Sequence, residues 1–202
     1  MAGLHTMVYI SRACHNKHRS PGAAGIAILT AVIACTTVRQ ASGATAAATR
    51  VRSTDAGILA LVREGTERSA TFNALVDTIG RSNGIVYIEF GYCAFGHLNG
   101  CLLSYIAPAH GDRYLRIVVT PDKNRRSHDQ LLALITHELR HALEVIEHAD
   151  VVDVPAMEAL YRRIGTPETG GLTGYETSAA RAAGDAALSE LLARRLLLKG
   201  AK

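Results

Sequence analysis

The fold is decided by residues 127–146, which read SHDQLLALITHELRHALEVI. Ser127 followed by Gln130 is a capping-box pattern that begins a helix, and no Gly or Pro interrupts the stretch from there to Ile146. Apolar residues recur at helical spacing, namely Leu131, Leu132, Ile135, Leu139, Ala142, Leu143 and Ile146. The pattern predicts one amphipathic, partly buried helix.

The same stretch contains a metal-binding pattern, His137-Glu138-Leu139-Arg140-His141. Residues four apart share one face of a helix, so both imidazoles can reach a single metal ion. Glu138 lies next to the first histidine, where it can activate a metal-bound water. The pattern therefore predicts His137 and His141 as Zn2+ ligands and Glu138 as the catalytic residue. The alternative is a helix whose histidines only line a polar groove.

At these residues the chain resembles the zincins, zinc metallopeptidases that carry H-E-x-x-H on an active-site helix below a mixed sheet. The resemblance extends from about Thr66 onward, and it implies a hydrolase that cleaves a peptide or protein substrate. Arg140 departs from the stricter peptidase pattern, which keeps uncharged residues there, and we expect it to point to solvent or to pair with an acid such as Glu144. The departure keeps an alternative open: a non-catalytic, zincin-like envelope protein or lipoprotein that binds metal or a partner.

Catalytic zinc usually takes three protein ligands. His148 lies about 10 Å beyond His141 along a helix axis, so we expect it to be a helix-end residue instead. Glu176 resembles the downstream glutamate ligand of the gluzincin-type zincins, which implies that it completes the site. The alternatives are that Glu176 only stabilises a helix N-terminus, or that Asp153 or Glu158 is the ligand.

Two supporting roles have several candidates each. A carboxylate that orients a ligating histidine would come from Glu144, Asp150 or Asp153. Tyr161, Tyr175 and His110 are candidates for stabilising an oxyanion, although an ordinary packing or surface role is favoured for each of them.

The rest of the domain predicts an α+β fold, and the order of its elements resembles that of a zincin, which implies a zincin-like architecture. We expect a short antiparallel or mixed sheet packed on the metal-binding helix, with further helices toward the C-terminus. The expected elements are a helix over 64–79, strands over 85–90, 102–107 and 114–120 arranged as a meander, a short helix over 155–163, and a last helix from 175 to about 198.

Residues 1–48 have the order of a secretory signal: a basic stretch, an uncharged apolar run over 23–35 and a tail of small residues. Val32-Ile33-Ala34-Cys35 also resembles a bacterial lipobox, which would make Cys35 a lipidation site. We therefore expect a signal peptide or lipoprotein leader with a linker over 1–48, and one zincin-like metal-binding domain over 49–202. The protein would be exported, as a periplasmic, extracellular or lipid-anchored protein, and would meet a membrane only through that anchor.

Charge and cysteine usage agree with this interpretation. Of the 22 Lys and Arg residues, three precede Cys35, but none of the 18 acidic residues does, so the remainder carries a net charge of only +1 and does not predict nucleic-acid binding. Cys93 and Cys101 flank a short turn between strand-like segments, which suits a disulfide in an oxidising compartment. The alternative for the two cysteines is that they are unpaired small core residues.

Overall fold

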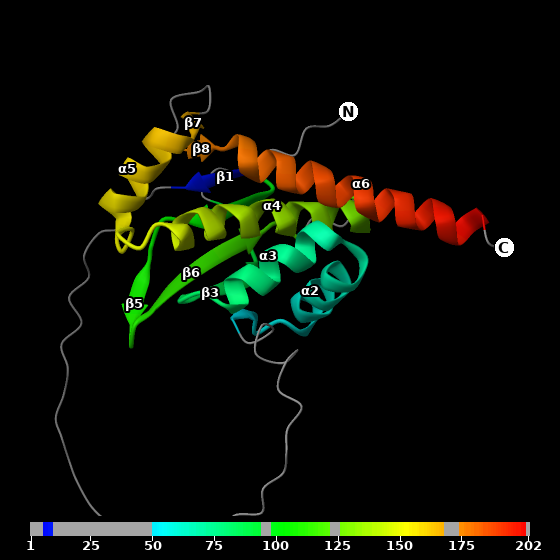
Figure 1. Ribbon diagram of the computed structural model, residues 1–202, viewed down its shortest axis with the longest axis horizontal. Coiled ribbons are helices and arrows are strands. Elements are labelled where there is room, and N and C mark those ends of the chain that lie inside the picture. The colour runs from blue at the N-terminus through cyan, green and yellow to red at the C-terminus, as the bar shows by residue number, and fades with distance from the viewer. Residues whose placement is uncertain (1–5, 10–49, 94–97, 122–125, 168–173, 201–202) are drawn as a thin grey trace, which may run out of the picture.

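The computed structural model describes residues 6–9, 50–93, 98–121, 126–167 and 174–200 (Figure 1). These residues form a mixed α+β fold of five helices and a small mixed sheet, which confirms the predicted class at this level. Cys35 lies outside the described residues. The helices are α2 Ala56–Arg68, α3 Ala70–Gly80, α4 His128–Glu147, α5 Val154–Ile164 and α6 Ser178–Gly200. The strands are β1 Thr6–Tyr9, β2 Val51–Arg52, β3 Gly84–Phe90, β4 Gly100–Leu103, β5 Ala107–Ala109, β6 Asp112–Val119, β7 Thr166–Pro167 and β8 Gly174–Glu176.

The strand order is β2-β3-β6-β4-β1-β8-β7, and β5 pairs with β6. The expected meander is wrong, because β3 and β6 are parallel neighbours and β4 pairs antiparallel on the far side of β6. The chain reverses between β5 and β6 at His110 and Gly111, which both have positive φ (53° and 85°). This turn leads β6 into the centre of the sheet, where its alternate residues Leu115 and Ile117 are fully buried.

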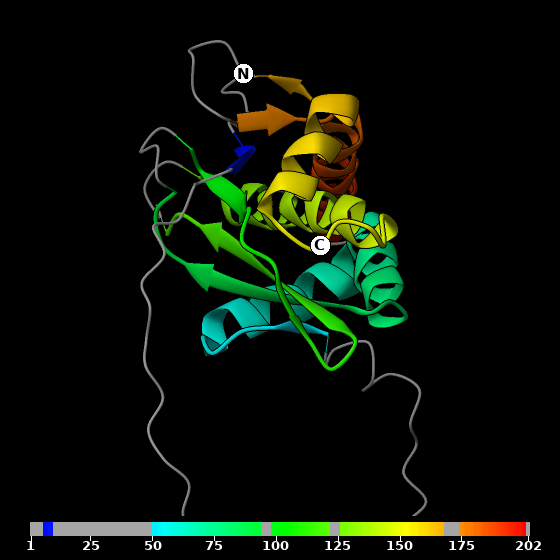
Figure 2. The same ribbon diagram turned by 90° about the vertical axis from the view of Figure 1, so that its left-hand side faces the viewer.

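Strand β1 consists of residues that the sequence assigned to the leader. Thr6–Tyr9 pairs parallel with β4 over its whole length and antiparallel with β8. Figure 1 draws it in blue above α4 and next to β8, and Figure 2 shows the same blue strand between β8 and β4. The expected domain boundary at residue 49 leaves this strand outside the domain, whereas the structure includes it in the sheet.

Helix α4 runs across the middle of the molecule, with β3 and β6 on one side and α6 on the other (Figure 1). It begins as predicted, because Ser127 and Gln130 form both hydrogen bonds of the capping box. His148 is its C-cap residue, which confirms the helix-end prediction. Core side chains of the sheet, including Ile88 and Leu102, pack in one cluster with those of α4. The helix is therefore buried along most of its length.

The Arg113 side chain, on β6, holds the other end of this helix. Arg113 is only 4% exposed, and its guanidinium donates to the carbonyl groups of Val145, Ile146, His148 and Val151 at 2.6–3.0 Å. A positive charge at a helix C-terminus is favourable, because the last carbonyls carry partial negative charge. Arg113 therefore ties α4 to the sheet.

The single helix expected over 64–79 is instead two helices, α2 and α3. Ser69 separates them, because it has extended backbone angles and its side chain accepts a hydrogen bond from the Phe72 N–H, as an N-cap does. The Phe72 ring packs so closely on Gly65 that a Cβ there would lie 2.5 Å from the ring. The predicted short helix and last helix correspond to α5 and α6. No helix in the described ranges is long and apolar enough to span a membrane.

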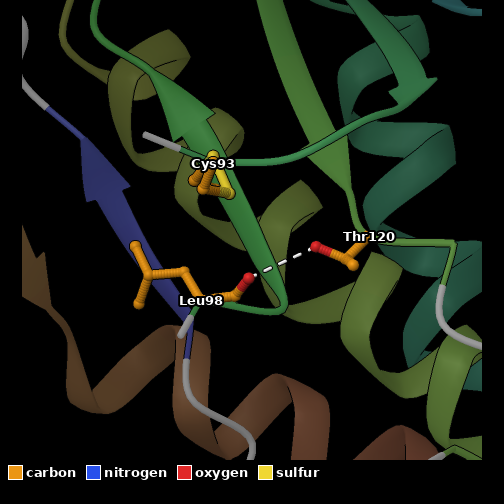
Figure 3. Close-up of a disulfide and its surroundings, with 4 residues drawn as sticks. Cys93, Leu98 and Thr120 are labelled. Atoms are coloured by element: carbon orange, nitrogen blue, oxygen red, sulfur yellow. Dashed lines mark hydrogen bonds between the residues drawn. A yellow bond between two sulfur atoms is a disulfide. The ribbon is translucent and has the colours of Figure 1, made fainter. Parts of the chain in front are cut away.

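The predicted disulfide between Cys93 and Cys101 is present (Figure 3). It lies in a small second cluster with Leu98 and Val118, on the face of the sheet opposite the main core. The segment leading into β4 is further held by Thr120, whose hydroxyl donates to the Leu98 carbonyl at 3.2 Å. The start of β4 is therefore fixed by a covalent bond as well as by its pairing with β6.

Candidate metal site

Three side chains from two distant parts of the chain meet beside α4. His137 and His141 lie one turn apart on its buried face, and Glu176 reaches them from the end of β8. The distances are 3.4 Å between His137 Nε2 and Glu176 Oε2, and 3.6 Å between His141 Nε2 and Glu176 Oε1. All three ligand atoms lie within 4.8 Å of one another. The cluster is therefore compact enough to hold one metal ion.

Glu176 is positioned by the junction between β8 and α6. The Thr177 hydroxyl accepts a hydrogen bond from the Ala180 N–H at 3.1 Å and so caps α6, and the Thr177 N–H donates to Glu176 Oε1 at 2.7 Å. Helix α6 then packs very closely on α4, since a Cβ on Gly184 would lie 3.3 Å from the His137 Cβ. Glu176, which the sequence predicts near the start of a helix, therefore lies at the end of β8, just before α6.

Glu144 supports the second histidine. His141 Nδ1 lies 2.9 Å from Glu144 Oε2, and the Thr177 hydroxyl donates to Glu144 Oε1 at 2.6 Å. A carboxylate that accepts the Nδ1 proton directs Nε2 of the same ring toward a metal. Of the three carboxylates proposed for this role, Glu144 occupies it, while Asp153 caps α5.

The acids and histidines shift one another's pKa values strongly. Burial and the nearby His141 lower the pKa of His137 to about 3. Burial also acts to lower the pKa of His141, but the hydrogen bond to Glu144 and the nearby carboxylate of Glu176 raise that pKa to about 9. Both carboxylates keep pKa values below their usual range despite burial, because of these contacts. The cluster therefore holds two carboxylates in their charged form inside the protein.

Glu138 lies next to the cluster in a different state. It is fully buried, and neither carboxylate oxygen has a hydrogen-bond partner of normal geometry among the described residues. Burial raises its pKa to about 8, while His141 acts in the opposite direction, as does the backbone N–H of Leu102. Gly100 of β4 lies directly against it, since a Cβ there would be 2.8 Å from Glu138 Oε1.

These residues fit a transition-metal ion. Two imidazole nitrogens and one carboxylate oxygen form the ligand set that proteins use for catalytic zinc. His141 Nε2 is buried and has no hydrogen-bond partner among the described residues, which is costly for a polar atom unless it binds something. This atom is one of the three candidate ligand atoms, and all three lie within 4.8 Å of one another.

The remaining ligand candidates lie elsewhere. Glu158 is on α5, where it pairs with Arg162 one turn later, and His148 is bonded to the Glu144 carbonyl at 2.8 Å. Arg140 points away from the cluster and pairs with Glu147 at 3.2 Å, with Glu144 also 3.9 Å away. The expected behaviour of Arg140 is thus confirmed, and its charge does not enter the face of α4 that carries His137 and His141.

The candidates for oxyanion stabilisation have structural roles. The buried Tyr161 hydroxyl donates to the His141 carbonyl at 2.9 Å, and Tyr175 stacks on the Tyr161 ring. His110 is exposed in the turn before β6. The favoured packing and surface interpretations therefore describe Tyr161 and His110 correctly.

Sequence reasoning missed three contributors to the site: Thr177, Gly184 and Gly100. Thr177 was recognisable as a helix N-cap ahead of an Ala-rich stretch, but not as a partner of Glu144. Gly184 stands among alanines in a helix, which is a signal of close helix packing. Nothing in the sequence indicates that Gly100 lies over Glu138.

Two cavities lie away from the cluster. One, of about 670 Å³, has Phe90, Arg126 and His128 among its lining residues, and the other, of about 440 Å³, has Tyr87, Tyr105 and Tyr114. Neither is lined by a residue of the metal cluster, so we do not assign the chemistry to them. Comparisons with models of protein families, with curated proteins and with solved structures found no match to this chain.

Proposed function

We propose that this protein is a zinc-dependent hydrolase with a zincin-like fold, acting as a metallopeptidase on a peptide or protein substrate. One observation carries the proposal: His137, His141 and Glu176 converge within 4.8 Å beside the buried carboxylate of Glu138, which has no hydrogen-bond partner of normal geometry among the described residues. Three ligands leave a coordination position open, which distinguishes a catalytic zinc site from a structural one. A closed four-ligand site would have favoured a purely structural role.

Zinc bound there would supply a Lewis acid that polarises a carbonyl group and makes water more acidic. His137, His141 and Glu176 would hold it, and Glu144 would keep the His141 ring in its binding orientation. Glu138 would accept a proton from the attacking water and pass it to the leaving amine.

Export of the protein belongs to the same proposal. The basic and apolar order of residues 1–48 supports it, as does the disulfide, which persists in oxidising compartments. Release as a periplasmic or extracellular protein and lipid anchoring at Cys35 are both compatible with these features.

The second candidate function is a zincin-like protein that binds metal or a partner without turnover. One observation favours it: the position beside β4, where an extended peptide would pair with the sheet, is filled by Thr6–Tyr9.

The test compares the wild-type full chain with Glu138→Gln and, as a matched control, with Glu67→Gln on the exposed surface of α2. We expect stoichiometric zinc in all three proteins and cleavage of a fluorogenic peptide library by wild type and Glu67→Gln. We expect Glu138→Gln to lose at least about 1,000-fold in rate, as removal of a proton shuttle does. Stoichiometric zinc without cleavage of any peptide would favour the second candidate, and absence of zinc would contradict both.

A further inference from the structure

Strand β1 fills a space between two other strands that do not pair with each other in the described sheet. All four of its residues pair with β4, from Thr6↔Gly100 to Tyr9↔Leu103, and its far side pairs with β8 at Val8↔Tyr175 and Tyr9↔Gly174. Neighbouring strands lie about 4.8 Å apart, so β4 and β8 are separated by about two such spacings. This space, which we call the β4–β8 slot, admits a single extended chain.

The two walls of the slot carry the candidate metal site. The β4 wall begins at Gly100, which lies against Glu138, and the β8 wall ends at Glu176. The register between β1 and β4 pairs Thr6 with Gly100. When the antiparallel register between β1 and β8 is continued by one pair, the residue of β1 that follows Thr6 lies opposite Glu176. A chain in the slot therefore crosses the site between the proposed proton shuttle and a proposed metal ligand.

Each wall is held by contacts that do not involve β1. The β4 wall is paired with β6 and tied to Cys93 by the disulfide. The β8 wall is held by its pairing with β7 and by the Thr177 hydrogen bond to Glu144, and Tyr175 stacks on Tyr161. Without β1, both walls would present unpaired backbone N–H and C=O groups to the slot, and such groups bind another strand.

We propose that the β4–β8 slot is a two-sided binding site for one extended peptide backbone, and that Thr6–Tyr9 is its internal occupant and competes with other peptides for it. The proposal rests on the proposed function for what the bound peptide undergoes, but not for the binding itself. Recognition through backbone pairing on both sides requires an extended conformation and places few demands on side chains. The occupant belongs to the segment predicted as a leader, so processing that removes the leader would open the slot.

The test uses the full chain with Val8→Pro, because proline removes a backbone donor and is excluded from the centre of a sheet. Val8→Thr, which keeps a β-branched residue, is the matched control. The probe is a fluorescein-labelled peptide of sequence TMVYIS, identical to residues 6–11, whose binding is followed by fluorescence anisotropy. We expect Val8→Pro to bind it at least 10-fold more tightly than wild type and Val8→Thr. Equal binding by all three proteins would overturn the proposal.

Two further measurements separate this proposal from the proposed function. Cleavage of the fluorogenic library should be at least 10-fold faster for Val8→Pro than for wild type. If Val8→Pro binds the peptide and cleaves nothing, the result supports peptide binding in the β4–β8 slot and contradicts the proposed hydrolase function. If Val8→Pro does not fold, hydrogen exchange of the wild-type chain decides: amides within Thr6–Tyr9 should exchange at least 100-fold more slowly than in the free peptide, and unprotected exchange would overturn the proposal.

Discussion

The Thr177 hydroxyl donates a hydrogen bond to Glu144 Oε1 at 2.6 Å, while Glu144 Oε2 lies 2.9 Å from His141 Nδ1. The hydrogen bond between Thr177 and Glu144 links the segment that carries Glu176 to α4, the helix that carries both histidines. One carboxylate therefore orients a proposed ligand and also fixes the distance between the two elements that supply the ligand set.

Replacing Glu144 by Gln should weaken zinc binding by about 10-fold or more, the usual effect of losing a carboxylate behind a ligating histidine. The measurement is the zinc dissociation constant by competition with a chelator at constant pH. Glu147→Gln, on the exposed side of the same helix, serves as the control and should bind zinc like wild type. A purely structural role would instead lower the melting temperature of the zinc-free protein and leave zinc affinity unchanged.

Gly100→Ala should reduce peptide cleavage by about 10-fold or more while zinc remains bound. The added methyl group would lie 2.8 Å from Glu138 Oε1 and 3.0 Å from a Leu134 methyl, so the carboxylate must move. Small displacements of a catalytic group have large effects on rate. Steady-state kinetics and metal content measured on the same preparation check this, and unchanged kinetics would show that Glu138 tolerates displacement.

Arg113→Leu should lower the free energy of unfolding by about 3 kcal/mol, because the buried carbonyls at the end of α4 lose a charged donor. Urea denaturation monitored by circular dichroism measures the change. Arg116→Leu is the matched control on the same strand: its ion pair with Glu89 is exposed, so we expect a loss of less than about 1 kcal/mol. Similar losses for both variants would contradict the role assigned to Arg113.

Removal of the disulfide by the double substitution Cys93→Ser and Cys101→Ser should cost about 2–3 kcal/mol of stability, as expected for a short closed loop. Reductant should lower the melting temperature of wild type toward that of the double variant and leave the variant unaffected. Zinc content should be retained in both proteins, since neither cysteine lies in the metal cluster.

Glu190 should make the stability depend on pH. It accepts hydrogen bonds from the Ser69 and Thr71 hydroxyls and from the Thr71 N–H at 2.6–3.1 Å, and these bonds lower its pKa despite partial burial. A group whose pKa is lower in the folded state stabilises the protein above its unfolded-state pKa, and this stabilisation is lost as pH falls through the folded-state value. Glu190→Gln should therefore cost about 1 kcal/mol at pH 7 and much less near pH 3. Urea titrations at the two pH values measure this, with Glu67→Gln on the exposed surface of α2 as the control.

The local features of α4 were predictable because they depend on neighbouring residues: the capping box of Ser127 and Gln130, the apolar stripe, and the shared face of His137 and His141. The role of Glu144 was among the sequence hypotheses for the same reason, since it lies one turn beyond His141. Glu176 could be proposed only through a resemblance. It follows His141 by 35 positions, and spacing alone does not show that two residues so far apart in the chain lie close together in the fold.

The sheet topology was not predictable in the same way. Alternation of buried residues identifies β3 and β6 as strands but does not say that they are parallel neighbours. The division between α2 and α3 depends on Ser69, whose capping role overrides an apolar pattern that continues through it. Strand β1 was missed because a short apolar-polar segment within a signal-like sequence carries no mark of its distant partners.

The late place of Glu176 in the chain also limits when the candidate metal site can be assembled. Within the described sheet, β8 joins the central strands through β1, where Val8 pairs with Tyr175, a residue synthesised much later. Contacts so distant in sequence form late in folding, since the intervening chain must first be ordered. Both histidines leave the ribosome well before Glu176. A nascent chain therefore lacks one of the three candidate ligands through most of its synthesis, and the cluster can form only after Glu176 has been added.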